Sequence, residues 1–145
     1  DRRRAWVEVD LDALCRNAAV AAGRAGVPLL PMVKADAYGL GAVPVARALR
    51  AVRPWGFGVA SVPEGEQLRA AGIAGPIVLF TPILPAELPR AHRAGLTPSL
   101  HRAEDVVAWA ALGGDAPWHL AIDTGMCRAG VRWDAVDAIR DAAAA

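Results

Sequence analysis

The sequence predicts an α/β fold in which short strands alternate with helices around a parallel sheet. Apolar, β-rich runs recur at intervals of roughly 20–25 residues, and helical patterns separate them. The runs are almost continuously apolar, as is typical of parallel strands that are covered by helices. Counted from residue 29, this alternation gives about five β/α units, preceded by an N-terminal strand and helix.

The expected elements follow one another without a low-complexity linker. Residues 6–10 alternate between apolar and polar side chains, like a half-buried strand, and residues 11–24 form a helix that Asp10 or Asp12 caps. The strands expected after it are residues 29–33, 56–60, 77–80, 96–100 and 118–123. The helices that alternate with them are residues 43–52, 63–71, 85–94, 103–112 and 133–145.

A closed (β/α)8 barrel has eight such units and typically about 250 residues, so a chain of 145 residues can form only part of one. A small doubly wound sheet would fit the length, but no glycine-rich dinucleotide-binding fingerprint follows an expected strand. The chain also stops inside a helix, at consecutive alanines, which indicates a truncation. We therefore expect residues 1–145 to be the N-terminal part of a (β/α)8 TIM-type barrel.

Composition and charge exclude several classes of function. A formal net charge of +1 gives no electrostatic reason to expect nucleic acid or a membrane surface as partner. No apolar run approaches the ~18 residues of a membrane span, and no signal peptide is expected. Cys15 and Cys127 are too few and too far apart to indicate a disulfide framework or a metal site. The expected protein is reduced and cytoplasmic.

Lys34 is the first candidate for chemistry. Of the 16 basic residues, Lys34 is the one lysine, and the others are arginines. Arginine stays protonated in proteins, whereas a lysine amine can act as nucleophile or base. Lys34 follows an apolar strand and precedes a glycine-bearing loop, and in parallel barrels such strand ends form the reactive face. The alternative is a surface lysine in a turn, with Tyr38 half-buried beside it; spacing alone does not separate the two.

The histidines and tryptophans have structural explanations. His119 lies on an expected strand and is interpreted as an interior residue. His92 and His101 are interpreted as surface or loop residues. The tryptophans are scattered without a stacking pattern for nucleic acid, so core packing is expected for them.

Four blocks of the sequence resemble the alanine racemases. Residues 6–14, WVEVDLDAL, are similar to the start of these enzymes. Residues 33–41, VKADAYGLG, resemble their cofactor-lysine motif, which reads VKADAYGHG or VKANAYGHG. Residues 56–60 and 64–72 resemble the next block, and residues 123–130, DTGMCRAG, resemble the family's DTGMxRxG turn. The blocks occur in the family's order and cover essentially the whole chain.

The resemblance implies a fragment of the fold-type III pyridoxal-phosphate barrel, from an enzyme that interconverts L- and D-alanine for peptidoglycan and the cell wall. By the same resemblance, Lys34 is the Schiff-base lysine that holds pyridoxal 5'-phosphate, and one of two acid/base groups. Tyr38 would donate a hydrogen bond to the cofactor phosphate. Arg128 would contact the cofactor's phenolic oxygen and the substrate. The full-length enzyme would be a homodimer.

The sequence departs from the family pattern at several points. Leu40 stands where the lysine motif usually has histidine. Ala121 stands where many members have a lysine whose carbamate supports the arginine. The family's second base is a tyrosine from the C-terminal β-domain of a partner subunit, whereas the one tyrosine here is Tyr38. Because that β-domain and the later barrel strands are missing, we expect residues 1–145 alone to be inactive.

Two alternatives to a racemase remain. The first is a related barrel that binds pyridoxal phosphate without racemising amino acids and acts in cofactor homeostasis; the DTGMCRAG block and the aromatic residue in the lysine motif favour the racemase. The second is a truncated, non-catalytic association domain. Its open sheet edges, near residues 29–33 and 118–123, would invite pairing with another strand.

Overall fold

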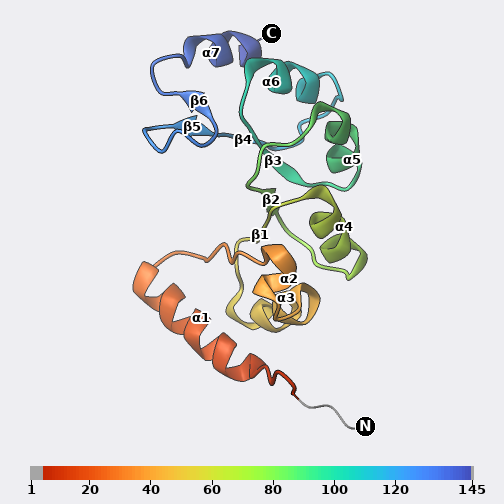
Figure 1. Cartoon of the computed structure of the whole chain (residues 1–145), viewed down its shortest axis with the longest axis vertical. Coiled ribbons are helices and arrows are strands. Elements are labelled where there is room, and N and C mark those ends of the chain that lie inside the picture. The colour runs from red at the N-terminus through yellow and green to blue at the C-terminus, as the bar shows by residue number, and fades with distance from the viewer. Residues whose placement is uncertain (1–4, 145) are drawn as a thin grey trace.

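The computed structural model describes residues 5–144, in which short strands alternate with helices. Figure 1 shows β1 to β4 in one row, with α4 and α5 along one side of it. The helices are α1 (Leu11–Ala25), α2 (Lys34–Tyr38), α3 (Ala42–Leu49), α4 (Val62–Ala70), α5 (Leu88–Arg93), α6 (Ala103–Ala110) and α7 (Asp137–Ala144), with 3-10 segments η1 (Arg50–Val52) and η2 (Pro85–Glu87). The strands are β1 (Phe57–Val59), β2 (Ile77–Leu79), β3 (Thr97–Leu100), β4 (His119–Leu120), β5 (Ile122–Asp123) and β6 (Val131–Arg132).

The sheet is parallel, and its strands lie in the order in which they occur along the chain. The order is β1-β2-β3-β4, and every neighbouring pair is parallel. Met32 adds a single parallel bridge to Gly58 on the outer side of β1. A doubly wound sheet would reverse its strand order at a switch point. The sequential order therefore confirms the parallel α/β class and matches the winding of a barrel portion, with two free edges among the described strands.

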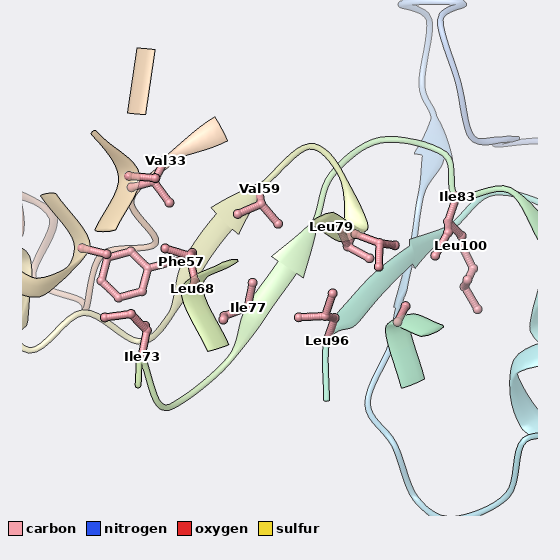
Figure 2. Close-up of a cluster of buried hydrophobic side chains, with 14 of the residues drawn as sticks. Val33, Phe57, Val59, Leu68, Ile73, Ile77, Leu79, Ile83, Leu96 and Leu100 are labelled. Atoms are coloured by element: carbon pink, nitrogen blue, oxygen red, sulfur yellow. The ribbon is translucent and has the colours of Figure 1, made fainter. Parts of the chain in front are cut away.

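The hydrophobic core lies around β1, β2 and β3, which are buried along their full length. Figure 2 shows Val59, Ile77, Leu79 and Leu100 along these strands, together with Leu68 of α4. Full burial on both faces explains why these strands read as continuous apolar runs instead of alternating ones. The predicted positions of these three strands are confirmed to within one residue at each end.

Two expected strands are not formed as predicted. Residues 6–10 form no strand in the described chain, and Trp6 and Val7 are exposed. Residues 29–33 do run beside β1, since the carbonyls of Leu29 and Pro31 accept hydrogen bonds from the N–H groups of Trp55 and Gly58. Their pairing is limited to a single bridge at Met32, because Pro31 has no backbone N–H to give to the ladder. The alternating pattern of residues 6–10, in contrast, indicates a preferred face and does not supply a partner strand.

Two elements near the C-terminus differ from expectation. The expected strand 118–123 divides at Ala121, whose N–H donates to the Leu100 carbonyl at 2.9 Å while its own carbonyl accepts from Val131 N–H at 2.8 Å. The partner strand thus changes from β3 to β6 at this residue. The expected helix 133–145 begins only at Asp137 and is described to residue 144. No helix of the described chain is long and apolar enough to cross a membrane, and both cysteines are free.

Candidate functional site

A cavity of about 630 Å³ opens at the carboxyl ends of the parallel strands. Its lining comes from the bridge segment, the ends of β2, β3 and β4, and the turn between β5 and β6. The lining residues are Met32, Lys34, Phe80, Thr81, Pro82, His101, Ala121, Ile122, Asp123, Thr124, Met126, Arg128 and Ala129. In parallel barrels this end of the sheet carries the reactive groups. The structure therefore brings two predicted site residues, Lys34 and Arg128, to one cavity.

Lys34 is half-buried and is the first residue of an unusual turn. The buried Val33 before it is fixed to β1, since its N–H donates to the Gly58 carbonyl at 2.8 Å. The next four residues, Ala35 to Tyr38, have φ values between 51° and 56°, so α2 is a left-handed turn built without glycine. Left-handed backbone costs an L-residue roughly 1–2 kcal/mol. Contacts from other parts of the chain must therefore hold this turn.

Two carboxylates hold the turn by accepting hydrogen bonds from backbone amides. Glu64 of α4 accepts from Ala35 N–H at Oε1 (2.9 Å), and at Oε2 from Ala60 (2.7 Å) and Ser61 (3.2 Å). Asp36 Oδ1 accepts from the N–H of Ala42 at 2.7 Å, at the start of α3. Sequence reasoning gave Glu64 no role. The signal was present, because Ser61 and Glu64 have the S-x-x-E spacing of a capping box.

The turn that carries Arg128 is organised by its own backbone. Asp123 Oδ1 accepts hydrogen bonds from Gly125 N–H (2.9 Å) and Cys127 N–H (3.0 Å), and these donors lower the pKa of Asp123. Gly130 has a φ of +114°, and a Cβ added there would lie 2.9 Å from the Ala121 carbonyl oxygen. Glycine is thus required where β5 and β6 approach each other. Arg128 itself is exposed at the rim of the cavity.

Tyr38 lies apart from this cavity. Its side chain is 64% exposed and lines a second, apolar cavity of about 400 Å³ between α1, α3 and residues 29–33. Leu40, the departure in the lysine motif, lines this second cavity as well. Ala121, the other departure, lines the first cavity and leaves space there that a longer side chain would fill. The structure brings Lys34 and Arg128 together and does not bring Tyr38 to them.

The structure corrects the predictions for His92 and His119, whereas His101 lies in a loop, as predicted. His101 follows β3 and lines the main cavity, and both of its ring nitrogens are buried without a hydrogen-bond partner among the described residues. Burial lowers the pKa of His101, and the nearby Asp105 opposes this shift. His119, expected in the interior, is exposed and meets Trp55 edge-on. His92 is half-buried, with Nε2 3.0 Å from the Gly113 carbonyl oxygen.

The tryptophans differ from one another in burial. Trp109 is buried and donates its indole N–H to the Ala116 carbonyl at 3.1 Å, as core packing predicts. Trp6, Trp55 and Trp133 are exposed instead. In the case of Trp6, the expected strand around it has no partner within residues 5–144.

Parallel strands in sequential order, with a lysine and an arginine in one cavity at their carboxyl ends, define a parallel α/β domain that corresponds to part of a β/α barrel. The chain belongs to the alanine racemase family. The family model "Alanine racemase, N-terminal domain" matches residues 9–145.

Relatives and solved structures agree with this assignment. The chain is 41% identical over 140 residues to an alanine racemase of Synechocystis sp., covering 91% of this chain and 37% of the relative. It is 43% identical over 137 residues to one of Azoarcus sp., covering 92% and 38%. The alanine racemase of Bacillus anthracis with bound L-Ala-P superposes with a TM-score of 0.85 at 29% identity, covering 98% of this chain and 38% of that one.

A histidine racemase from Leuconostoc mesenteroides has a similar fold. It superposes with a TM-score of 0.85 at 25% identity, covering 97% of this chain and 40% of its own. The chain thus spans about two fifths or less of the length of these relatives. The shared region is the parallel α/β part with the lysine motif and the DTGMCRAG turn, and the same fold serves more than one amino acid among these proteins.

Proposed function

We propose that this chain is the lysine-bearing part of a pyridoxal-phosphate-dependent racemase that interconverts L- and D-alanine. The observation that carries the proposal is the placement of Lys34, the one lysine of the chain, in the same cavity as Arg128 at the strand ends. The family assignment supports the reaction class. The names of the relatives support alanine as substrate, while the histidine racemase is the reason to test other amino acids beside it.

The residues of the cavity fit pyridoxal 5'-phosphate. A volume of about 630 Å³ lies in the range of small-molecule sites. A primary amine, a guanidinium and the Thr124 hydroxyl suit an anionic aldehyde. The one carboxylate in the lining, Asp123, directs an oxygen to backbone amides of its own turn. When bound, this cofactor serves as an electron sink for the carbanion left when an amino acid loses its Cα proton.

Each residue then has a distinct part in the reaction. Lys34 Nζ would hold the cofactor and would move a proton to or from the substrate Cα on one face. Arg128 would donate hydrogen bonds to the cofactor. Tyr38 is proposed to bind the phosphate with its hydroxyl, which requires its side chain to turn away from the second cavity that it lines here.

Inversion at Cα requires a second acid/base group on the opposite face of the substrate. Tyr38, the one tyrosine of the chain, belongs to the lysine motif, and Lys34 can serve one face only. We therefore propose that residues 1–145 are the N-terminal part of the barrel domain and that the second base comes from a partner subunit of a homodimer. Production of D-alanine for the cell wall in the cytoplasm is the corresponding role.

A second candidate function is a non-catalytic association domain. It is favoured by the free edges of the sheet in the described chain, one beyond the Met32 bridge beside β1 and one at β4. An unpaired strand edge is a surface on which another chain can pair. This candidate predicts concentration-dependent self-association without any reaction at Lys34.

Trapping with borohydride separates the two candidates. The chain is incubated with pyridoxal phosphate, reduced with sodium borohydride, digested and examined by peptide mass analysis. The racemase proposal expects an adduct on Lys34 that is lost in Lys34→Arg, whereas labelling of the N-terminal amine serves as the non-specific control. A chain without an adduct at Lys34 would refute the cofactor assignment. Alanine racemisation by residues 1–145 alone is expected to be absent, and robust turnover would refute the missing second base.

A further inference from the structure

Glu64 joins the lysine turn to the end of the neighbouring strand. Its carboxylate lies between Ala35, the residue after Lys34, and the pair Ala60–Ser61, which follows β1. Ala35 and Glu64 are 29 positions apart in the sequence. All three hydrogen bonds are donated by backbone N–H groups, so Glu64 helps to fix the backbone conformation beside Lys34.

The bonding pattern requires a carboxylate. Both oxygens of Glu64 accept hydrogen bonds, one from Ala35 and the other from Ala60 and Ser61. An amide side chain of the same shape has one acceptor and one donor. Its donor would therefore face a backbone N–H on one of the two sides. The oxygen would take the side with two donors, and Ala35 would lose its partner.

The hydrogen bond from Ala35 N–H to Glu64 is important for Lys34 because of its position. Ala35 is the first residue of the left-handed turn, whose conformation is unfavourable for residues other than glycine. On the other side of Lys34, Val33 is fixed to Gly58 and accepts a hydrogen bond from Ala37 at its carbonyl (2.8 Å). Lys34 is thus held between two anchored neighbours. Loss of the Ala35 anchor would free one of them.

We propose that Glu64 is a positioning residue that fixes the backbone of Lys34 and so directs its amine into the cavity. The structural part of this inference rests on the hydrogen bonds of Glu64. Its consequence for the cofactor rests on the proposed function of Lys34. The turn of Arg128 is instead held by Asp123 of the same segment, and no helix of the described chain donates or accepts a side-chain hydrogen bond there. Glu64 therefore acts on the lysine side of the site.

The test compares Glu64→Gln and Glu64→Asp with Glu66→Gln. Gln keeps the shape of the side chain, and Asp keeps the charge but is one methylene shorter. Glu66 lies on the same helix and pairs with Arg90 of α5, so its variant controls for changes in α4 itself. Amide hydrogen exchange at Ala35 and Ala60 is measured first. Exchange at Ala35 is expected to become on the order of tenfold faster in both Glu64 variants and to stay unchanged in the control. Exchange at Ala60 should change little in Glu64→Gln.

Borohydride trapping then measures the consequence for the cofactor. The pyridoxal phosphate concentration that gives half-maximal labelling of Lys34 is expected to rise on the order of tenfold in both Glu64 variants, with no change in Glu66→Gln. Unchanged exchange at Ala35 would overturn the structural link, and unchanged labelling would overturn the positioning role. If Glu64→Asp keeps the exchange and labelling of the unsubstituted chain, the negative charge is sufficient and the hydrogen-bonded bridge between Ala35 and Ala60–Ser61 is not needed. This result also overturns the proposal.

The two proposals can fail separately. If the unsubstituted chain gives no adduct on Lys34, the proposed function fails together with the role of Glu64 toward the cofactor. Faster exchange at Ala35 would in that case still establish Glu64 as the anchor of the turn.

Discussion

The two sides of the candidate site are built differently. The lysine side lies on buried structure: Val33 and Ala37 are in the core, and Glu64 of another helix reaches over to the turn. The arginine side lies on a short turn between two-residue strands, with Arg128 exposed and a single carboxylate, Asp123, bonded to its own segment. Both turns contain left-handed residues, Ala35 to Tyr38 in one and Cys127 in the other.

This difference shows where each half of the site gets its geometry. The backbone of Lys34 is determined by contacts within residues 5–144. The position of the Arg128 side chain is less determined there, since residues 124–128 of its turn are all exposed. We expect substitutions under the lysine side to have large effects on stability, and substitutions on the arginine side to have small or local ones.

The largest expected difference in stability is between the variants Leu68→Ala and Ile122→Ala. Leu68 is fully buried in the core near the lysine side, so its truncation is expected to lower the free energy of unfolding by about 2–5 kcal/mol. Ile122 is 46% exposed beside the arginine turn, and its truncation should cost less than about 1 kcal/mol. Urea unfolding followed by circular dichroism measures both. Equal losses in the two variants would contradict the contrast between the two sides.

A second pair tests whether the arginine turn depends on one glycine. Gly130→Ala places a Cβ against the Ala121 carbonyl at a positive φ and is expected to cost about 1–3 kcal/mol. Gly23→Ala in α1 is the matched control, because a Cβ there meets nothing within 4 Å. This control should instead stabilise the chain by about 0.5–1 kcal/mol.

The same unfolding measurement checks this pair, and amide exchange shows where the damage lies. Faster exchange at Cys127 in Gly130→Ala, with unchanged exchange at Ala35, would place the effect on the arginine side alone. An alanine at residue 130 that leaves both stability and exchange unchanged would show that the turn can shift to accept a side chain.

Local sequence patterns predicted the elements that are determined locally or by burial. Strands β1, β2 and β3 were found because strands covered on both faces are continuously apolar. The first helix was placed by its cap, and Ala13 N–H indeed donates to Asp10 Oδ1 at 2.8 Å. The sequence pattern placed Lys34 after an apolar run, the family resemblance added Arg128 to the same site, and the structure has both in the lining of one cavity.

Non-local interactions account for what the sequence did not reveal. The left-handed turn after Lys34 opposes the propensity of its own residues and depends on Glu64, which lies 29 positions away. Residues 6–10 have a strand pattern but no partner in the described chain. His101 lies in a loop, as predicted, but its position directly after β3 gives no local sign that its ring nitrogens are buried.

His101 gives the smallest and most pH-dependent of the expected effects. Its ring nitrogens are buried without a partner within residues 5–144, so His101→Phe is expected to stabilise the chain by about 1 kcal/mol at neutral pH. His119→Phe is the control, because that ring is exposed and keeps an aromatic edge toward Trp55. Its stability should stay within about 0.5 kcal/mol of the unsubstituted chain.

The sign of the pH dependence follows from the lowered pKa of His101. Between the lowered value and the ordinary value of about 6.5, the unfolded chain binds a proton that the folded chain does not. Stability due to this group is therefore complete above about pH 7 and decreases as the pH falls toward the folded-state pKa. Urea unfolding is measured between about pH 7 and pH 5. The free energy of unfolding should fall more steeply in the unsubstituted chain and in His119→Phe than in His101→Phe. Parallel curves for all three proteins would mean that the ring of His101 is hydrated or paired in solution, which would contradict its burial without a partner.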